Sequence, residues 1–245
     1  MINRIALVTD FGLGGPYVGQ MQLRLAELVP AIRVLDLISD LPPFRPDLSA
    51  YFIPALVRDM PDGTLYLCVV DPGVGGGRGA LVIKADGCWY VGPDNGLMAA
   101  VAQRGKDVQV LRVDWRPEHM SDSFHGRDLF APIAAMLCDG KIPPCTDIEP
   151  EQMVGGDWPC DLLRIVYVDH YGNLMTGLRA AALDREAILD AGGRKLGFVR
   201  TFCEGPPGTA FWYENSFGLV ELAVNQGSAG RDLRLAVGDP IGVSM

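Results

Sequence analysis

Six short runs of consecutive apolar residues in the first half of the chain constrain its fold more than any other feature. The first run, residues 4–9, is apolar at nearly every position, which is typical of a strand buried on both faces of a sheet. The runs lie at residues 4–9, 32–38, 64–70, 80–84, 88–92 and 108–113. They predict the strands of one covered sheet.

Helical patterns lie between several of these runs. Residues 18–29 have apolar side chains at intervals of three and four, which is typical of a helix with one buried face. Similar patterns occupy residues 48–60, 96–105 and 127–140. Strands that alternate with helices predict an α/β domain whose parallel or mixed sheet is covered by helices.

The pattern changes near residue 142. Residues 142–160 are rich in proline, glycine and acids and have no sustained period, which predicts a linker. Beyond them the segments are short, strand-like and separated by glycines, which is typical of a small barrel-like β domain. We therefore expect an N-terminal α/β domain at residues 1–141, a linker at 142–160 and a C-terminal β domain at 161–245.

Composition and charge disfavour several classes of protein. The formal net charge of −9 offers no basic surface for a phosphate backbone, so nucleic acid is not expected as a partner. No apolar stretch approaches 18 residues, so no membrane span is expected. The six cysteines form no Cys-x-x-Cys pair, and with only three histidines no metal site is expected. We expect a cytoplasmic protein with reduced cysteines and no signal peptide.

Polar residues follow three of the predicted strands. Asp10 follows the first strand, Asp71 opens a glycine-rich segment that ends at Arg78, and Asn95 lies in a Pro-Asp-Asn-Gly sequence. Ligands of open α/β sheets bind beyond the carboxyl ends of the strands, where a carboxylate can accept the hydroxyls of a ribose. The alternatives are a cap for Asp10, a flexible hairpin for the glycine-rich segment and a turn for Asn95.

A rare histidine lies in a second polar segment. His125 stands beside Arg127 and Asp128, just before the last predicted helix of the first domain. Histidine is a natural proton carrier near neutral pH. The alternative is a surface loop in which Asp128 acts only as a favourable charge at the start of the helix, and for Asp128 we favour that interpretation.

Two segments of the second domain carry further polar residues. Asn173 could pair with an adenine edge and Tyr171 could stack on the base, whereas an Asx turn with a core tyrosine is the alternative. The sequence from Asn215 to Glu221, by itself, indicates a hairpin connection.

Taken together, these segments resemble one family. Thr-Asp-Phe-Gly, Val-Asp-Pro-Gly-Val-Gly, Pro-Asp-Asn-Gly, Phe-His-Gly-Arg-Asp, Asp-x-Tyr-Gly-Asn and Asn-Ser-x-Gly-x-x-Glu occur in this order between Ile5 and about Gly242. The same order is found in the S-adenosyl-L-methionine (SAM) hydroxide adenosyltransferases, also called SAM hydrolases. These enzymes are relatives of the bacterial fluorinating and chlorinating enzymes.

The resemblance implies a reaction, an assembly and a set of site residues. The reaction is hydrolysis of SAM to adenosine and L-methionine, by in-line attack of water or hydroxide on ribose C5′, with no cofactor. The assembly is a homotrimer whose sites lie between the N-terminal domain of one chain and the C-terminal domain of its neighbour. The implied catalytic triad is Asp71, Arg78 and His125. The implied substrate contacts are Asp10, Phe44, Asn95, Asp169, Tyr171, Asn173, Phe202, Ser216, Glu221 and Gln226.

The chain also departs from its relatives at two places. Residues 14–16 read Gly-Gly-Pro where the family commonly has an aspartate, so an acid for the methionine ammonium is missing there. Val74 and Gly126 offer no hydroxyl where the halogenating relatives hold a halide, which disfavours halide chemistry.

Three alternatives to hydrolysis stay open. A halide adenosyltransferase is the nearest to it. A SAM-dependent methyltransferase is disfavoured because Tyr17 stands where a glycine fingerprint counted from Gly12 needs its last glycine. A non-catalytic module that binds SAM or adenosine would not need Asp71, Arg78 and His125 together.

Overall fold

The protein is described here by a computed structural model that covers residues 1–244. It divides into two compact units. Met1–Ala50 and Asp59–Trp158 form the first unit, and Tyr51–Arg58 joins the chain from Pro159 onward in the second. Helix α2 (Pro46–Leu56) therefore begins in one unit and ends in the other.

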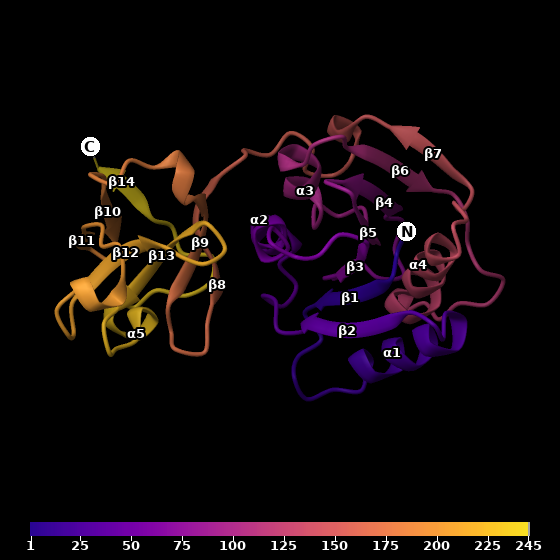
Figure 1. Ribbon diagram of the computed structural model, residues 1–245, viewed down its shortest axis with the longest axis horizontal. Coiled ribbons are helices and arrows are strands. Elements are labelled where there is room, and N and C mark those ends of the chain that lie inside the picture. The colour runs from indigo at the N-terminus through magenta and orange to yellow at the C-terminus, as the bar shows by residue number, and fades with distance from the viewer. Residues whose placement is uncertain (245) are drawn as a thin grey trace. The chain divides into compact units, whose positions relative to one another are not determined.

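A seven-stranded mixed sheet forms the centre of the first unit, in the order β2-β1-β3-β5-β4-β6-β7 (Figure 1). Its strands are β1 (Arg4–Thr9), β2 (Arg33–Ile38), β3 (Thr64–Val69), β4 (Ala80–Ala85), β5 (Cys88–Pro93), β6 (Gln109–Val113) and β7 (Cys145–Ile148). Strands β2, β1, β3 and β5 run parallel, whereas β4 is antiparallel to both of its neighbours and β7 is antiparallel to β6. The predicted α/β unit with a mixed sheet is confirmed.

Helices α1 (Tyr17–Leu28) and α4 (Ala131–Cys138) pack together against one face of this sheet (Figure 1). The π-helical turn η1 (Gly126–Phe130) leads into α4, and α3 (Ala99–Arg104) contacts β4. Alternate strand residues such as Ile5 and Leu7 are fully buried against Met21 and Leu25 of α1. Every second residue of the strand packs against residues spaced three or four apart on the helix, as the sequence pattern predicts.

Strand β2 differs from the other parallel strands because it lies at the edge of the sheet. Its apolar sequence resembles that of the buried strands, but none of its six residues is fully buried. An edge strand has only one neighbour, so part of its apolar surface stays uncovered within this chain.

The segment expected to be a linker contains regular structure in its first part. Strand β7 pairs with β6, and the 3₁₀ turn η2 (Pro150–Gln152) follows it. Gln103 of α3 then donates its side-chain amide to the carbonyl oxygens of Gly155, Gly156 and Trp158 at 3.1, 3.1 and 2.8 Å. A four-residue strand is too short to show a period, so composition alone did not indicate it. The proposed domain ranges stay a prediction.

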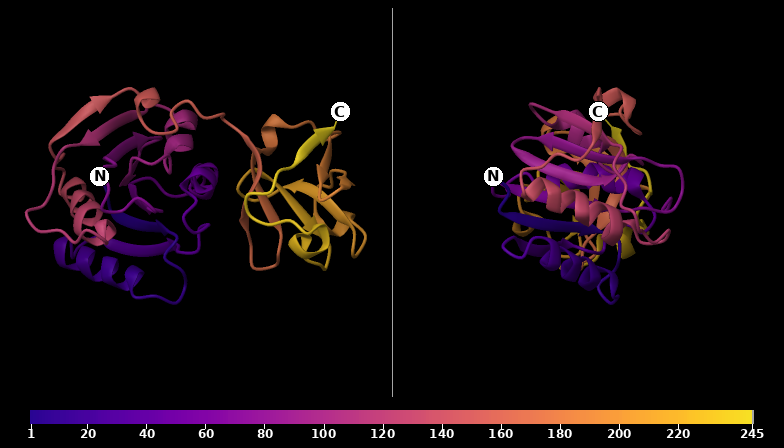
Figure 2. Two further views of the ribbon diagram at one scale, coloured as in Figure 1. Left: turned by 180° about the vertical axis from the view of Figure 1, so that it is seen from behind. Right: turned by 90° about the vertical axis from the view of Figure 1, so that its right-hand side faces the viewer.

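The second unit contains two antiparallel sheets (Figure 2). The four-stranded sheet has the order β12-β13-β9-β8, and the three-stranded sheet has the order β11-β10-β14. The strands are β8 (Leu162–Val168), β9 (Leu174–Arg179), β10 (Ile188–Ala191), β11 (Arg194–Leu196), β12 (Ala210–Glu214), β13 (Leu219–Val224) and β14 (Gly242–Ser244). The turns η3 (Ala180–Ala182) and η4 (Phe202–Glu204) and the short helix α5 (Ala229–Leu233) connect them. The small β domain is confirmed, whereas its barrel-like arrangement is not confirmed and stays a prediction.

The second half of α2 is packed into this second unit. The ring of Phe52 stacks on Tyr167 with the centroids 5.0 Å apart, and its edge meets Phe217 at 5.6 Å. The Tyr51 hydroxyl donates to the carbonyl oxygen of Pro159 at 2.9 Å, and Arg58 donates to that of Ser216 at 3.3 Å. A segment from early in the sequence thus completes the core of the C-terminal unit. Among residues 1–244, no helix is long and apolar enough to cross a membrane.

Candidate active site

Strand register brings three of the predicted residues to one edge of the first sheet. Thr9 of β1 lies opposite Val69 of β3, so the acids that follow these strands, Asp10 and Asp71, leave the sheet at the same edge. Asn95 follows the neighbouring strand β5 and donates its amide to the carbonyl oxygen of Val70 at 2.9 Å. Its own side-chain oxygen accepts the backbone N–H of Leu97 at 3.2 Å. Asn95 therefore holds the end of β3 in place.

Asp71 and Arg78 form a buried, two-pronged ion pair. Arg78 Nε donates to the two Asp71 carboxylate oxygens at 2.9 and 3.1 Å, and Arg78 Nη2 donates to Oδ2. Only 5% of the Asp71 side chain and 10% of the Arg78 side chain are exposed. The guanidinium also lies 5.0 Å from the centre of the Phe130 ring. This geometry fixes the guanidinium plane and leaves the carboxylate fully engaged.

His125 completes this group of three. Its Nδ1 lies 2.8 Å from Arg78 Nη2, which can only donate, so Nδ1 accepts and the neutral ring carries its proton on Nε2. Burial and the positive charge of Arg78 hold the pKa of His125 below its usual value of 6.5. Nε2 is buried and has no hydrogen-bond partner within residues 1–244. A buried polar atom of this kind indicates a place for a water molecule or a ligand atom.

A close backbone approach brings the glycine-rich loop to the histidine segment. Gly75 has a φ of +79°, and a Cβ there would lie 2.6 Å from the carbonyl oxygen of Asp122. No side chain fits this position, so glycine is required.

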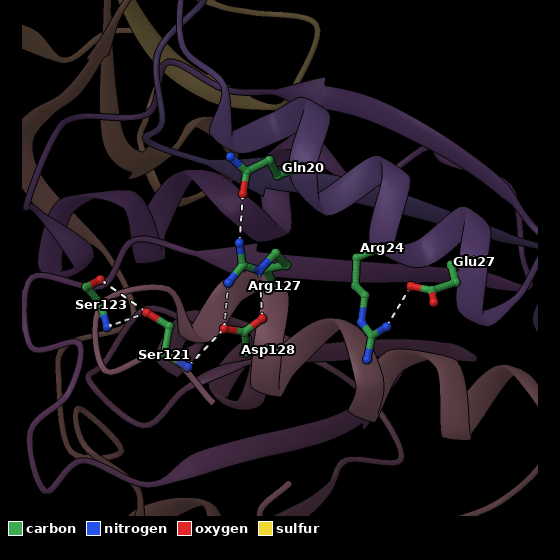
Figure 3. A network of polar contacts seen from close by, with 7 residues as sticks. All are labelled: Gln20, Arg24, Glu27, Ser121, Ser123, Arg127 and Asp128. Atoms are coloured by element: carbon green, nitrogen blue, oxygen red, sulfur yellow. Dashed lines mark hydrogen bonds and ion pairs between the residues drawn. The ribbon is translucent and has the colours of Figure 1, made fainter. Parts of the chain in front are cut away.

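An aromatic and polar network supports the segment that carries His125. The rings of Phe11, Tyr17 and Phe124 contact one another, with centroids 5.4 to 5.9 Å apart. Arg127 lies over Phe124 at 5.0 Å and donates to Gln20 of α1 at 2.8 Å (Figure 3). Phe11 follows Asp10 and Phe124 precedes His125, so these contacts connect two predicted site segments.

Asp128 acts as an anchor for the same segment. Its carboxylate pairs with Arg127 and accepts the backbone N–H of Ser121 at 3.0 Å (Figure 3). The ion pair keeps the pKa of Asp128 below its usual value. Asp128 therefore has a structural role, as we favour from the sequence. It lies in the first turn of η1 and also holds the preceding loop through the contacts described above.

Asp10 is tied to a second exposed loop. Its Oδ2 accepts the backbone N–H of Phe44 at 3.0 Å, while burial raises its pKa above the usual value of 3.8. Phe44 has a φ of +60°, which is uncommon for a residue with a large side chain, and 72% of it is exposed. A strained loop that presents an aromatic ring to solvent is typical of a ligand-binding segment.

In the second unit, the loop after β8 is held by one carboxylate. Asp169 accepts the backbone N–H groups of Tyr171 and Asn173 and the Asn173 side-chain amide, each at 2.9 Å. This is the Asx turn that the sequence offered as the alternative. It leaves Tyr171 75% exposed while Asn173 is buried. The turn and a binding role are compatible, since the turn presents the aromatic ring to solvent.

A cavity of about 570 Å³ gathers five of the predicted residues in the second unit. These are Asp169, Tyr171, Asn173, Phe202 and Gln226. Tyr213 and Arg231 also line the cavity, and neither was indicated by the sequence. Tyr213 follows two buried aromatic residues of β12, and this sequence pattern does not distinguish a core tyrosine from a cavity wall.

Ser216 and Glu221 do not line this cavity. Glu221 is buried behind it, where it accepts the Tyr213 hydroxyl at 2.5 Å and the Asn215 amide at 2.7 Å. Burial raises the pKa of Glu221 above its usual value. The backbone oxygen of Ser216 accepts from Arg58. Glu221 therefore supports the cavity wall by orienting Tyr213.

The structure thus assembles two groups of the predicted residues, one in each unit. Asp71, Arg78 and His125 are in direct contact in the first unit, and five residues line one cavity in the second. Among the residues that the structure describes, no cluster of three or more His, Cys, Asp or Glu side chains is suited to a metal ion.

Comparisons with known proteins find similar sequences over nearly the whole chain. Residues 5–147 match a model of the SAM hydroxide adenosyltransferase N-terminal domain, and residues 163–242 match the corresponding C-terminal domain. An (R)-S-adenosyl-L-methionine hydrolase from Salinispora arenicola is 36% identical, covering 98% of this chain and 97% of its own. A protein of the same name from Thermus thermophilus is 35% identical, over 97% and 98% of the two chains.

More distant relatives and solved structures extend this picture. A fluorinase from an Actinoplanes species is 24% identical over 90% of each chain. A crystal structure of an uncharacterized conserved protein from Thermotoga maritima superposes with a TM-score of 0.82 at 26% identity, covering 98% of this chain and all of the other.

Proposed function

The chain belongs to the SAM hydroxide adenosyltransferase family, and on that premise we propose that it hydrolyses SAM to adenosine and L-methionine. The observation that carries the proposal is a buried hydrogen-bond network in which Arg78 donates to both Asp71 and His125. A protein that only binds SAM does not require an arginine that is held by both an aspartate and a histidine.

In the proposed reaction, the oxygen of a water molecule bonds to ribose C5′ as the C5′–S bond breaks. The electron pair of that bond stays on the methionine sulfur, and the water releases one proton to the solvent. Sulfonium is a good leaving group, so the barrier depends mostly on the nucleophile and its alignment. Holding water and C5′ about 3 Å apart and in line with the leaving sulfur lowers this barrier substantially.

We assign the three buried residues different parts. Arg78 stabilises the negative charge that develops on the attacking oxygen, because a fixed cation in a buried site favours hydroxide over water. Asp71 fixes the plane of the guanidinium. His125 accepts from Arg78 through Nδ1 and offers Nε2–H to orient the water.

The remaining residues are proposed to bind the substrate. Asp10 accepts the ribose hydroxyls, beside the exposed ring of Phe44. The cavity of the second unit receives the adenine, with Tyr171 and Phe202 against its faces and Asn173 and the Gln226 backbone at its edge. Asp169 and Ser216 are assigned to the amino-acid end of SAM, and Asn95 and Glu221 support these groups from behind.

We further propose that the protein is a homotrimer in which each site combines the first unit of one chain with the second unit of a neighbour. The division of the assigned residues between two units supports this assembly, because each unit holds only part of the set.

Halide transfer is the second candidate function, and the fluorinase relatives are the reason to keep it. Val74 and Gly126 argue against it, since neither has a hydroxyl that could hold a halide. A Cβ at Gly126 would lie 3.1 Å from Met21 Sδ, so even a serine at this position would be crowded.

The deciding experiment identifies the products made from SAM in ¹⁸O-labelled water. Hydrolysis at C5′ gives adenosine and methionine in equal amounts, with the label in the 5′-hydroxyl of adenosine. Added chloride or fluoride should give no 5′-halo-adenosine. Formation of S-adenosylhomocysteine, or of methionine with unlabelled adenosine, would contradict the proposal.

A further inference from the structure

A second cavity, of about 730 Å³, lies at the other end of the first unit's sheet. The candidate active site is at the carboxyl ends of β1 and β3, whereas this cavity is lined by the residues that begin β1, β2 and β3. Strand β2 forms the outer edge here, next to β1 (Figure 1). Nothing in the proposed reaction uses this cavity.

Strand register places two arginines side by side in its lining. Arg4 of β1 lies directly opposite Arg33 of β2, and both side chains line the cavity. Thr64 of β3 lies opposite Arg4 on its other side. The three residues form one row across the sheet, and Arg4 is its centre.

The two guanidinium groups have no direct ion-pair partner among residues 1–244. Neither Arg4 nor Arg33 forms an ion pair or a side-chain hydrogen bond there. Asp36 also lines the cavity, but its carboxylate accepts the Ser39 hydroxyl at 3.0 Å and pairs with neither arginine. Like charges directly opposite each other destabilise a sheet, so this arginine pair lowers the folding stability of the protein when no ligand is bound. It also stands out in a chain whose net charge is −9.

The next row of the sheet is apolar. Ala6 lies between Leu35 of β2 and Tyr66 of β3, and all three line the cavity. Tyr66 is 1% exposed and forms the floor, whereas Leu35 is 44% exposed at the rim. The Thr64 hydroxyl already donates to the Pro61 carbonyl oxygen at 2.6 Å. The two arginines are the cations of this cavity, and its further polar groups are Asn3, Asp36 and the buried Tyr66 hydroxyl, which has no hydrogen-bond partner among the described residues.

We propose that this cavity binds a phosphate monoester that carries a flat apolar group. The phosphoryl oxygens lie between Arg4 and Arg33, and the apolar group covers the row of Ala6, Leu35 and Tyr66. Guanidinium groups bind phosphoryl oxygens through paired N–H donors. Two adjacent cations are neutralised by a dianion, whereas a monocarboxylate neutralises only one.

Calorimetry with phenyl phosphate, and with benzoate as the singly charged comparator, tests this proposal on the full chain. Phenyl phosphate should bind more tightly than benzoate. Arg4→Gln and Arg33→Gln should each weaken its binding by about tenfold or more. Arg194→Gln, which removes an exposed arginine of β11 in the second unit, is the matched control and should leave binding unchanged.

Thermal unfolding adds a second measurement. Without ligand, Arg33→Gln should raise the melting temperature by about 1–2 °C, because it removes the repulsion between the two arginines. With phenyl phosphate at a concentration that saturates the parent, the parent should gain more stability than the variant. Hydrolysis of SAM should be the same in both proteins.

Three outcomes would overturn the proposal. The first is a dissociation constant weaker than about 1 mM for phenyl phosphate. The second is equal binding by the parent and by both variants, or an equal loss in Arg194→Gln. The third is a change of oligomeric state in Arg33→Gln by sedimentation, which would make this face a contact between copies of the chain.

Discussion

The two units hold the carboxylates of their site residues in different ways. In the first unit, Asp71 is neutralised by the guanidinium of Arg78, and the pair is almost fully buried. In the second unit, Asp169 and Glu221 are satisfied only by neutral donors, namely backbone N–H groups, amides and the Tyr213 hydroxyl. Asp71 thus carries a compensated, rigid charge, whereas Asp169 and Glu221 have no attached cation. Asp10 of the first unit, which accepts the backbone N–H of Phe44, resembles the second group in this respect.

This difference matches the two tasks that we assign to the units. A fixed ion pair with a tightly placed histidine suits a chemical step, since no reorganisation is needed when charge develops. The Asp169 carboxylate, without an attached cation and beside the exposed ring of Tyr171, suits the binding of a planar, positively charged molecule, and SAM carries both an adenine and a sulfonium. The comparison predicts that substitutions of Asp71, Arg78 and His125 affect turnover and that those of the cavity residues in the second unit affect binding.

The largest effect is expected for Arg78→Ala. Loss of a charge-stabilising group in a buried site should lower kcat by about 10²–10⁴-fold, while adenosine binding measured by calorimetry stays close to that of the parent. Arg24→Ala, which removes the exposed ion pair with Glu27 on α1, is the control and should keep full activity. Normal turnover by Arg78→Ala would show that the catalytic group lies elsewhere.

A mixing experiment tests whether the two tasks belong to different chains. His125→Ala removes the chemical half of a site, and Asn173→Ala removes the binding half. In an equal mixture that exchanges subunits, about one site in four would combine two intact halves, so about a quarter of the parent activity should return at low SAM concentration. A mixture that shows only the average of the two variants, or a fully active monomer in light scattering, would contradict the trimeric site.

The pH dependence of turnover tests the protonation state of His125 in the first unit. His125 must be neutral to accept from Arg78, and its pKa is held below 6.5. Activity should therefore be constant around neutral pH and fall only as the pH drops through this lowered value, and His125→Ala should lose this acidic limb. The same lowered pKa means that stability from this group is present above pH 6.5 and is lost as the pH falls through the folded-state value. Activity that rises as the pH falls through the histidine pKa would show that the histidine works in its protonated form.

The smallest effect is expected for Glu221→Gln in the second unit. The pKa of Glu221 is raised in the folded state by burial, so its carboxyl increasingly disfavours folding as the pH rises from the unfolded-state pKa through that raised value. The parent and the variant should be equally stable near pH 4.5, and the variant should be more stable by about 1 kcal/mol or less near pH 7.5. Urea unfolding at both pH values measures this difference. A variant that is less stable at pH 7.5 would show that the charged carboxylate is favourable and that the contrast between the units is wrong.

The regular elements of the first unit were predictable because their periods are long and clear. Strand β1 and helix α1 begin and end within one residue of the predicted ranges. Strand β7 escaped prediction because four residues on a sheet edge carry no distinct pattern, and the left-handed backbone of Phe44 has no signal in its residue type.

The site was predictable mainly through the order of its motifs. Asp71 and Arg78 are close in the sequence, but the contact between Arg78 and His125 spans 47 positions and depends on how strand ends converge. Tyr213 and Arg231 line the second cavity but belong to none of the motifs. The paired arginines of β1 and β2 could not be predicted from the sequence either, because their pairing follows from strand order and not from spacing in the chain.

The split of helix α2 means that the two halves of this protein are not interchangeable modules. The matching family domains, residues 5–147 and 163–242, suggest a cut between two independent pieces. A fragment that begins at residue 159 would lack Phe52, which stacks on Tyr167, and Arg58, which binds the Ser216 carbonyl oxygen. Recombination between the two matched domains would therefore transfer the C-terminal β unit without the α2 residues that pack against it. Any natural fusion, truncation or circular permutation of this chain has to keep residues 51–58 together with the C-terminal strands.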